Sequence, residues 1–281
     1  MTITAGVDVG TGTVKVALFE SRKGAEPRWV GRAVERIRQR DPYQLAGDAY
    51  DAVLAEAGLG RGDVAYVATT GDGESLQFHT GHFYSMTTHA RGGVFLDPST
   101  RAVLDVGALH GRAIRTDERG KVLSYRMTSQ CASGSGQFLE NIARYLGIAQ
   151  DEIGALSRAG TNPEKVSSIC AVLAETDVIN MVSRGISAAN ILKGIHVSMA
   201  QRLVALLRGL GAFEGTVLCT GGLALDAGLV LALQESAAEG KMRVEVKSHP
   251  DAIFAGAIGA ALWGAFRHEK LQARSQLALA S

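Results

Sequence analysis

The chain is poor in cysteine and proline and carries almost no net charge. Its 281 residues include three cysteines and five prolines, and the formal net charge is +1. So few thiols favour free cysteines or metal ligands over structural disulfides. The balanced charge, without a basic stripe or an acidic tail, argues against a nucleic-acid-binding surface.

The sequence also lacks long apolar runs. It contains no stretch of 18 apolar residues, so we expect no transmembrane helix. The opening segment MTITAGVDVG has no charged region followed by a long apolar run, which argues against a signal peptide and favours a cytoplasmic protein. The 34 glycines fall mostly in short clusters, a pattern that suits close approach of the backbone to ligands better than a flexible linker.

Strand-like and helix-like segments alternate along the chain. We expect strands over 3–9, 14–20, 28–37, 64–70, 101–107 and 216–222, a hairpin turn within 114–122, and helices over 42–58, 136–147, 170–183, 188–209, from 226 onward and over 255–268. Three strands, a helix and a strand, followed by the same theme again, predict an α/β protein with two lobes. We assign the first lobe to 1–97, the second to 98–254, and a C-terminal helix that returns to the first lobe to 255–281.

A candidate phosphate loop follows the first strand. It consists of Asp8, Gly10, Thr11, Gly12, Thr13 and Lys15. The glycines expose backbone N–H groups, the threonines add hydroxyl donors, the lysine can meet phosphate charge, and the aspartate can hold Mg²⁺. The alternative is a plain hairpin turn, in which Gly and Thr are also common. The loop matches neither a Walker sequence nor a dinucleotide fingerprint.

Two further glycine turns lie at predicted strand ends. Asp105 and Gly107 repeat the Asp-x-Gly pattern, and Gly221 and Gly222 follow a later strand. Together with the first loop they favour nucleotide binding, with ATP and Mg²⁺ in a cleft between two lobes. The combination resembles the actin and sugar-kinase superfold, which implies phosphates between two hairpins and a late Gly-Gly turn behind the adenosine.

Two cysteines stand in small-residue motifs. Cys131 opens the turn CASGSGQFLE before a predicted helix, where the helix dipole would stabilise a thiolate, and Cys170 lies in SSICAVLAE. Two thiolates are half of the usual ligand set of a [4Fe–4S] cluster, which predicts a cluster shared between two nucleotide-binding subunits. The alternative is a pair of buried, inert cysteines, since neither has a CxxC partner. Cys219 lies in a predicted apolar strand and is expected in the core.

The motifs occur in the order expected of one family. They are GVDVGTGTVKVALFE, CASGSGQFLE, SSICAVLAETDVINMVSRG, ILKGIHVSMAQRL, TGGLALDAGL and AGAIGAALWGAF. The chain is thereby similar to the ATP-dependent activators of 2-hydroxyacyl-CoA dehydratases and the matching subunits of benzoyl-CoA reductase. This resemblance implies that Cys131 and Cys170 are cluster ligands and that a related ATPase subunit completes one [4Fe–4S] cluster.

The resemblance also implies partners and a reaction. ATP hydrolysis would drive a low-potential electron, supplied by reduced ferredoxin, into two further subunits. In the reductase those subunits bind benzoyl-CoA and reduce it to a cyclic dienoyl-CoA. Three alternatives stay open: an activator of a 2-hydroxyacyl-CoA dehydratase, a non-catalytic ATP-binding regulatory subunit, and an actin-like small-molecule kinase. The kinase would need a catalytic Asp beside the substrate hydroxyl, and no candidate stands out.

The second loop departs from the family pattern. The activators usually read Asp-Ile-Gly-Gly-Gln-Asp, whereas this chain reads Asp105-Val106-Gly107-Ala108-Leu109-His110. His110 is the one candidate catalytic residue for orienting the attacking water, and the alternative is a structural histidine. We therefore expect slow ATP hydrolysis by this chain, and a cluster partner that is a related but different chain.

Other polar residues have two interpretations each. His79, His82 and His89 could form a metal set, but their spacing among aromatic residues fits an interface loop as well. Glu175 and Asp177 could belong to the nucleotide cleft or be helix N-terminal charges.

Overall fold

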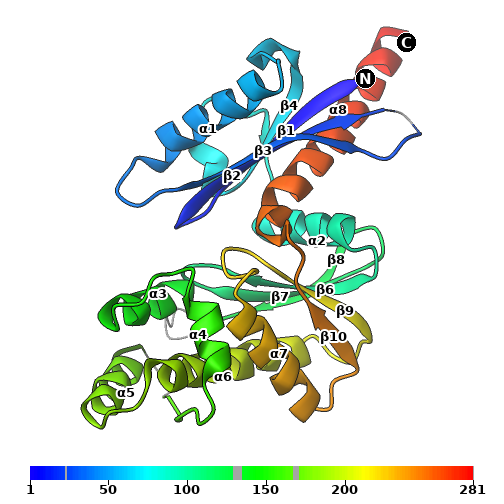
Figure 1. Ribbon diagram of the computed structural model, residues 1–281. Helices are drawn as coiled ribbons and strands as arrows, with labels where there is room; N and C mark the ends of the chain where they lie inside the picture. Colours follow the sequence, from blue (N-terminus) through cyan, green and yellow to red (C-terminus); the bar gives the residue numbers. More distant parts are fainter. Residues whose placement is uncertain (23, 129–134, 167–170, 281) are drawn as a thin grey trace. The chain divides into compact units, whose positions relative to one another are not determined.

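The computed structural model describes residues 1–22, 24–128, 135–166 and 171–280 (Figure 1). The chain divides into two compact units. Unit 1 comprises Met1–Leu96, Arg119–Lys121 and Phe254–Ser281, and unit 2 comprises Asp97–Glu118 and Val122–Ile253. No helix in the described ranges is long and apolar enough to cross a membrane.

Unit 1 is built on a five-stranded sheet. Its strands, in the spatial order β3-β2-β1-β4-β5, are β1 Thr2–Val9, β2 Thr13–Ser21, β3 Arg28–Arg36, β4 Val64–Gly71 and β5 Gly81–His82. The first three strands are antiparallel, whereas β4 runs parallel to β1 and β5 parallel to β4. Its long helices are α1 Pro42–Glu56, α2 Ser85–Leu96 and α8 Ala255–Ala280.

Helices α1 and α8 cover opposite faces of this sheet (Figure 1). Alternate residues of β1 face α1, because side chains alternate between the faces of a strand. On the other face, a Cβ on Gly6 would lie 1.9 Å from the carbonyl oxygen of Ala257, so only glycine lets α8 lie this close to β1. Gly92 and Gly259 bring α2 and α8 together in the same way.

Unit 2 repeats the sheet and adds a larger helical layer. The sheet has the order β10-β9-β6-β7-β8 and contains β6 Thr100–Val106, β7 Gly111–Thr116, β8 Val122–Met127, β9 Gly215–Thr220 and β10 Val244–Lys247. Its helices are α3 Gly136–Tyr145, α4 Ile153–Ala159, α5 Ala171–Ser183, α6 Ala188–Arg208 and α7 Ala227–Glu239.

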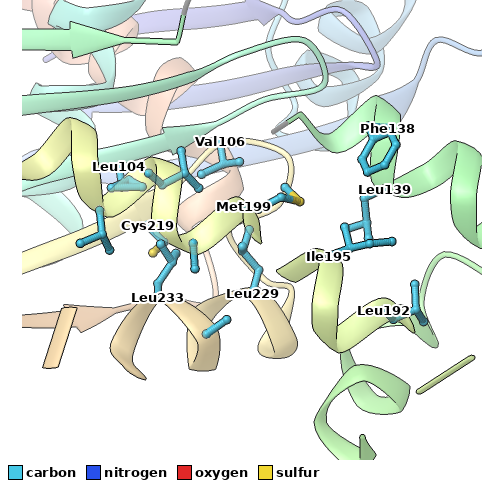
Figure 2. Packing of buried hydrophobic residues seen from close by; sticks show 14 of the residues in the cluster. Leu104, Val106, Phe138, Leu139, Leu192, Ile195, Met199, Cys219, Leu229 and Leu233 are labelled. Atoms are coloured by element: carbon cyan, nitrogen blue, oxygen red, sulfur yellow. The ribbon is translucent and has the colours of Figure 1, made fainter. Parts of the chain in front are cut away.

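The core of unit 2 forms around α6. Ile195, Met199 and Leu203 recur at four-residue spacing on one face of this helix and are fully buried. Figure 2 shows two of them with Leu104 and Cys219 of the sheet in one apolar cluster. Burial of each such side chain contributes about 1.5–3 kcal/mol, so this cluster is the main source of stability for unit 2.

Helix starts follow from local sequence. Asp41 caps α1 by accepting hydrogen bonds from two backbone amides, and Pro42 occupies the first helical position. Ser187 caps α6, and Asp226 caps α7 through its Oδ1 atom. Each of these three helices therefore begins directly after its capping Asp or Ser.

The two sheets have the same topology. In each, a hairpin of three antiparallel strands is followed by a strand that pairs in parallel with the first. Strands β1, β2, β3, β4 and β5 therefore correspond to β6, β7, β8, β9 and β10. The repeated lobe pattern that the sequence predicts is confirmed at the level of strand order.

Most predicted helices and strands are confirmed, with ends that differ by a few residues, and the following elements differ from the prediction. The last helix continues to Ala280, well beyond the predicted end at 268. One interpretation of the sequence places His89 in a loop, but this residue is buried in helix α2. No element was predicted for the short elements β5, β10 and α4, nor for the twelve-residue helix α2. Cys131 and Cys170 lie outside the described residues.

Candidate functional site

The first glycine loop lies over a buried ion pair. The amide of Gly10 donates to the carbonyl of Thr13 across 3.0 Å, which closes the turn between β1 and β2. Below the turn, Asp8 and Lys15 face each other in the strand register, with Oδ2 and Nζ 3.7 Å apart and side chains only 8% and 7% exposed. A Cβ on Gly10 would lie 3.3 Å from that Nζ, so the ammonium reaches the base of the turn.

The ion pair does not use the full hydrogen-bonding capacity of the Lys15 ammonium. A buried ammonium has three donors, and the 3.7 Å separation is longer than a charge-assisted hydrogen bond. A buried charge is costly unless it is paired and hydrogen-bonded. Lys15 is therefore suited to a further anionic partner at the exposed tip formed by Thr11 and Gly12.

The end of β4 lies beside this loop. Gly71 has φ +67°, and a Cβ there would lie 2.2 Å from the carbonyl of Val9 and 3.1 Å from Oδ1 of Asp8. The next residue, Asp72, donates its amide to Val9 across 2.8 Å and has an exposed side chain. Asp72 is thus a second acid at the loop. We did not predict it, although an acid directly after a buried strand was a usable signal.

Helices α2 and α8 meet below the same aspartate. Nε2 of His89 and Oδ2 of Asp8 both lie within 3 Å of the point that a Cβ on Gly256 would occupy. His89 is 4% exposed. No group of three or more metal-binding side chains occurs among the described residues, so the metal set of three histidines is wrong. His89 is a buried neighbour of Asp8.

The second glycine loop has the same form in unit 2. The amide of Gly107 donates to the carbonyl of His110 across 2.9 Å. Nη1 of Arg112 lies 3.1 Å from Oδ2 of the buried Asp105, and Nη2 of Arg112 bonds Nε2 of His110. We did not predict a role for Arg112.

The late glycine turn completes this second site. Gly221 has φ +84°, and a Cβ there would lie 2.4 Å from Oδ1 of Asp105 and 2.7 Å from the carbonyl of Val106. The following Gly222 is exposed, and nothing lies within 4 Å of its absent Cβ. Gly221 therefore lets the end of β9 lie in close contact with Asp105, and Gly222 leaves open space next to it.

The second loop is joined to the start of helix α3. The amide of Gly136 donates to the carbonyl of Gly107 across 3.0 Å, and the amide of Gln137 donates to Ala108 across 2.8 Å. The first amides of a helix have no partner within the helix, so these carbonyls satisfy them. A Cβ on Gly136 would lie 3.2 Å from the oxygen of Gly107, which accounts for the glycine. The helix that follows the Cys131 motif thus begins on the candidate phosphate loop.

Cys219 does not belong to a ligand set. It is 1% exposed within the core of unit 2, as predicted (Figure 2). Burial raises the pKa of its thiol to about 12, so the thiolate that a metal requires is strongly disfavoured. The predicted ligands Cys131 and Cys170 lie outside the described residues, and α5 begins at the residue after the second.

A buried polar network ties α4, α6 and α7 together. Nδ1 of His196 lies 2.7 Å from Oγ of Ser157, and its Nε2 lies 3.3 Å from Oδ2 of Asp226. Burial raises the pKa of Asp226, but His196 and two backbone amides outweigh it, so the pKa lies below its ordinary value. The adjacent cavity of about 10 Å³ can hold no more than a water, so the network stabilises the fold and takes no substrate.

Comparison with known proteins identifies close relatives. The model of the BadF/BadG/BcrA/BcrD ATPase family matches residues 5–264. The D subunit of the benzoyl-CoA reductase of Thauera aromatica is 72% identical over 271 residues, which cover 96% of both chains.

Two solved structures share the fold. Component A of the (R)-2-hydroxyglutaryl-CoA dehydratase of Acidaminococcus fermentans aligns with a TM-score of 0.86 at 29% identity, over 96% of this chain and all of the other. The activator of the 2-hydroxyisocaproyl-CoA dehydratase of Clostridium difficile, solved with bound ADPNP, aligns with a TM-score of 0.83 at 29% identity, over 97% and 98%. These likenesses confirm the predicted two-sheet α/β architecture of the actin type.

Proposed function

The chain belongs to the BadF/BadG/BcrA/BcrD ATPase family, and on that premise we propose that it is the D-type ATP-binding subunit of an ATP-dependent benzoyl-CoA reductase. The observation that carries the proposal is the identity of 72% with the D subunit of that reductase over almost the whole chain. The two acid–glycine loops agree with it, because each brings glycine backbone, a carboxylate and a cation to one strand end.

ATP with Mg²⁺ fits the residues of these loops. Gly10, Gly12, Gly107 and Gly222 would allow the backbone to approach phosphates or adenosine. Lys15 would meet phosphate charge, and Asp8 and Asp105 would contact the cation directly or through water. The ADPNP bound in the related activator supports a nucleotide in a protein of this fold.

A [4Fe–4S] cluster fits the thiols that remain after Cys219 is assigned to the core. Cys131 and Cys170 would supply two ligands, and a related ATPase subunit would supply the other two. When bound, the cluster would supply one-electron chemistry at low potential. This chain contributes the thiolates and the helix starts that follow them in sequence.

Backbone hydrogen bonds offer a path from nucleotide to helix. The carbonyls of Gly107 and Ala108 accept the first amides of α3, so a loop that shifts with the phosphate state would move the helix start with it. A nucleotide can shift the protein between two conformations only if it binds them with unequal affinity. ATP and ADP differ in the phosphate next to such a loop, and this difference can supply the unequal binding.

The proposal includes partners of stated kinds. They are a related ATPase subunit, two further subunits that bind benzoyl-CoA, and reduced ferredoxin as electron donor, all in the cytoplasm. An activator of a 2-hydroxyacyl-CoA dehydratase is the second candidate, because the two solved structures described above belong to such systems. Membership in an ATPase family argues against the small-molecule kinase.

Anaerobic co-expression with the related subunit and both substrate-binding subunits tests the proposal. We expect an EPR-active four-iron cluster in the complex but not on the isolated chain, and ATP hydrolysis that depends on benzoyl-CoA reduction. A complete cluster on the isolated chain would contradict the shared site. A complex that reduces no benzoyl-CoA but supports dehydration of a 2-hydroxyacyl-CoA would favour the second candidate.

A further inference from the structure

The repeated sheet topology shows that Arg112 in unit 2 corresponds to Lys15 in unit 1. In unit 1 the register pairs Asp8 with Lys15, and in unit 2 it pairs Asp105 with Arg112. Each acid is the next-to-last residue of the first strand of its unit, and each cation lies directly opposite on the second strand. Arg112 therefore occupies in the second loop the position that Lys15 occupies in the first.

The arginine makes one more contact than the lysine can. Its Nη1 is 3.1 Å from Oδ2 of Asp105, while its Nη2 bonds Nε2 of His110. A guanidinium is a planar fork with five donors, so one side chain can hold a carboxylate and a ring nitrogen at once. A single ammonium has no such fixed geometry. The side chain is 17% exposed, which leaves part of it accessible to a ligand.

This contact determines where the proton of His110 lies. A guanidinium only donates hydrogen bonds, so Nε2 of the imidazole must accept and must be unprotonated. In the neutral ring the other nitrogen, Nδ1, then carries the proton. Neither nitrogen has a lone pair left to take a proton from water.

We propose that Arg112 is the nucleotide-binding cation of the second loop and a positioning residue that holds His110 in a tautomer unable to act as a general base. The inference rests on the proposed nucleotide binding and deepens it. It leaves His110 able to donate a hydrogen bond from Nδ1 beside the loop, but not to accept the proton of an attacking water. It also gives a reason within this chain for the slow hydrolysis expected from the GALH sequence: the loop holds phosphate but does not activate water.

Nitrogen NMR of the histidine rings tests the tautomer directly. Long-range ¹⁵N–¹H spectra of the wild-type chain above pH 8, assigned by comparison with His110→Gln, should show His110 protonated on Nδ1. In Arg112→Met the contact is gone, and the signal should move toward the Nε2–H form. A His110 protonated on Nε2 in the wild type would overturn the proposal, whatever the variants do.

Affinity measurements test the cation. Arg112→Met should weaken binding of Mg²⁺–ADPNP to the full chain about tenfold to about a hundredfold, the loss expected for a hydrogen bond to a charged group. Arg112→Lys keeps the charge and should recover most of the affinity, but it should not restore the Nδ1–H tautomer. Arg115→Met is the matched control, because Arg115 lies on the same strand and contacts the ring of Phe213 instead.

The possible results distinguish a failure of the proposed nucleotide binding from a failure of the role assigned to Arg112. A wild-type chain that binds no adenine nucleotide would refute the proposed function. A wild-type chain that binds, with an Arg112→Met variant that melts normally and binds equally well, would refute the role of Arg112 alone.

Discussion

Replacing Gln137 with proline removes the backbone N–H that joins helix α3 to the second glycine loop. In the native chain this amide donates to the carbonyl of Ala108 across 2.8 Å. It lies in the first helical turn, where amides have no partner inside the helix, so proline costs α3 no internal hydrogen bond. The preceding residue is Gly136, whose missing Cβ eases the steric restriction that proline places on its neighbour.

The expected loss of folding free energy in Gln137→Pro is that of one backbone hydrogen bond. Such a bond contributes about 0.5–1.5 kcal/mol net, and the bond from Gly136 to Gly107 remains. The variant should therefore fold, with only a small drop in stability. The coupling between nucleotide and helix should fall by up to the same amount, which is about twofold to about tenfold in an equilibrium constant.

Hydrogen–deuterium exchange on the full chain measures this coupling. In the wild type, Mg²⁺–ADPNP should slow exchange of the α3 amides, because binding orders the loop that holds the helix start. In Gln137→Pro the slowing should be reduced about twofold to about tenfold. The Kd for the nucleotide should change by less, since the side chain of Gln137 faces Asn141 on its own helix.

Gln137→Ala is the matched control. It keeps the backbone N–H and loses only the side-chain hydrogen bond of 3.2 Å to Asn141. It should respond to nucleotide like the wild type. If Gln137→Pro also shows the full protection of α3 while binding nucleotide, the loop is not the route to the helix and the reasoning is refuted.

Three further predictions concern the glycine turn, the buried network and the cysteines. Gly221→Ala should destabilise the chain by about 1–3 kcal/mol in urea unfolding, because φ there is +84° and the Cβ would lie 2.4 Å from a carboxylate oxygen, whereas Gly222→Ala should be near neutral. Asp226 has a lowered pKa in the folded chain, so its stabilisation is present above the ordinary pKa of about 3.9 and is lost as the pH falls through the lowered value. Asp226→Asn should therefore reduce stability at pH 7 and flatten the acid-unfolding curve; an unchanged curve would contradict the assignment. Cys131→Ser should abolish the iron signal of the complex but spare nucleotide binding, whereas Cys219→Ala should lower stability and leave the iron content unchanged.

The glycine loops were accessible from the sequence because their signal is local. Gly10, Gly107 and Gly221 each follow an apolar run, and a strand followed by glycine is a turn whatever the fold. The two acids at the strand ends were found for the same reason. The duplication was also visible, since both lobes repeat one order of strand patterns.

Residues whose roles depend on neighbours across the sheet could not be assigned in this way. Arg112 lies seven positions after Asp105, and only the antiparallel register brings the two side chains together. His89 belongs to a helix whose weak periodicity we did not recognise, and it meets Asp8 through packing of α2 on α8. These contacts join segments that no local pattern connects.

The fold class was thus predicted correctly from the sequence alone, and the sequence also named the candidate residues for the chemistry. Three thiols, of which one lies in an apolar strand, leave two candidates for a shared cluster, and the spacing of apolar residues predicts two α/β lobes. Only the tertiary structure decided which cation faces each acid, and that the second loop holds the start of α3. Periodicity and turn residues act over a few positions of the chain, whereas ion pairs and helix docking depend on strand register and on glycines that let distant backbones touch.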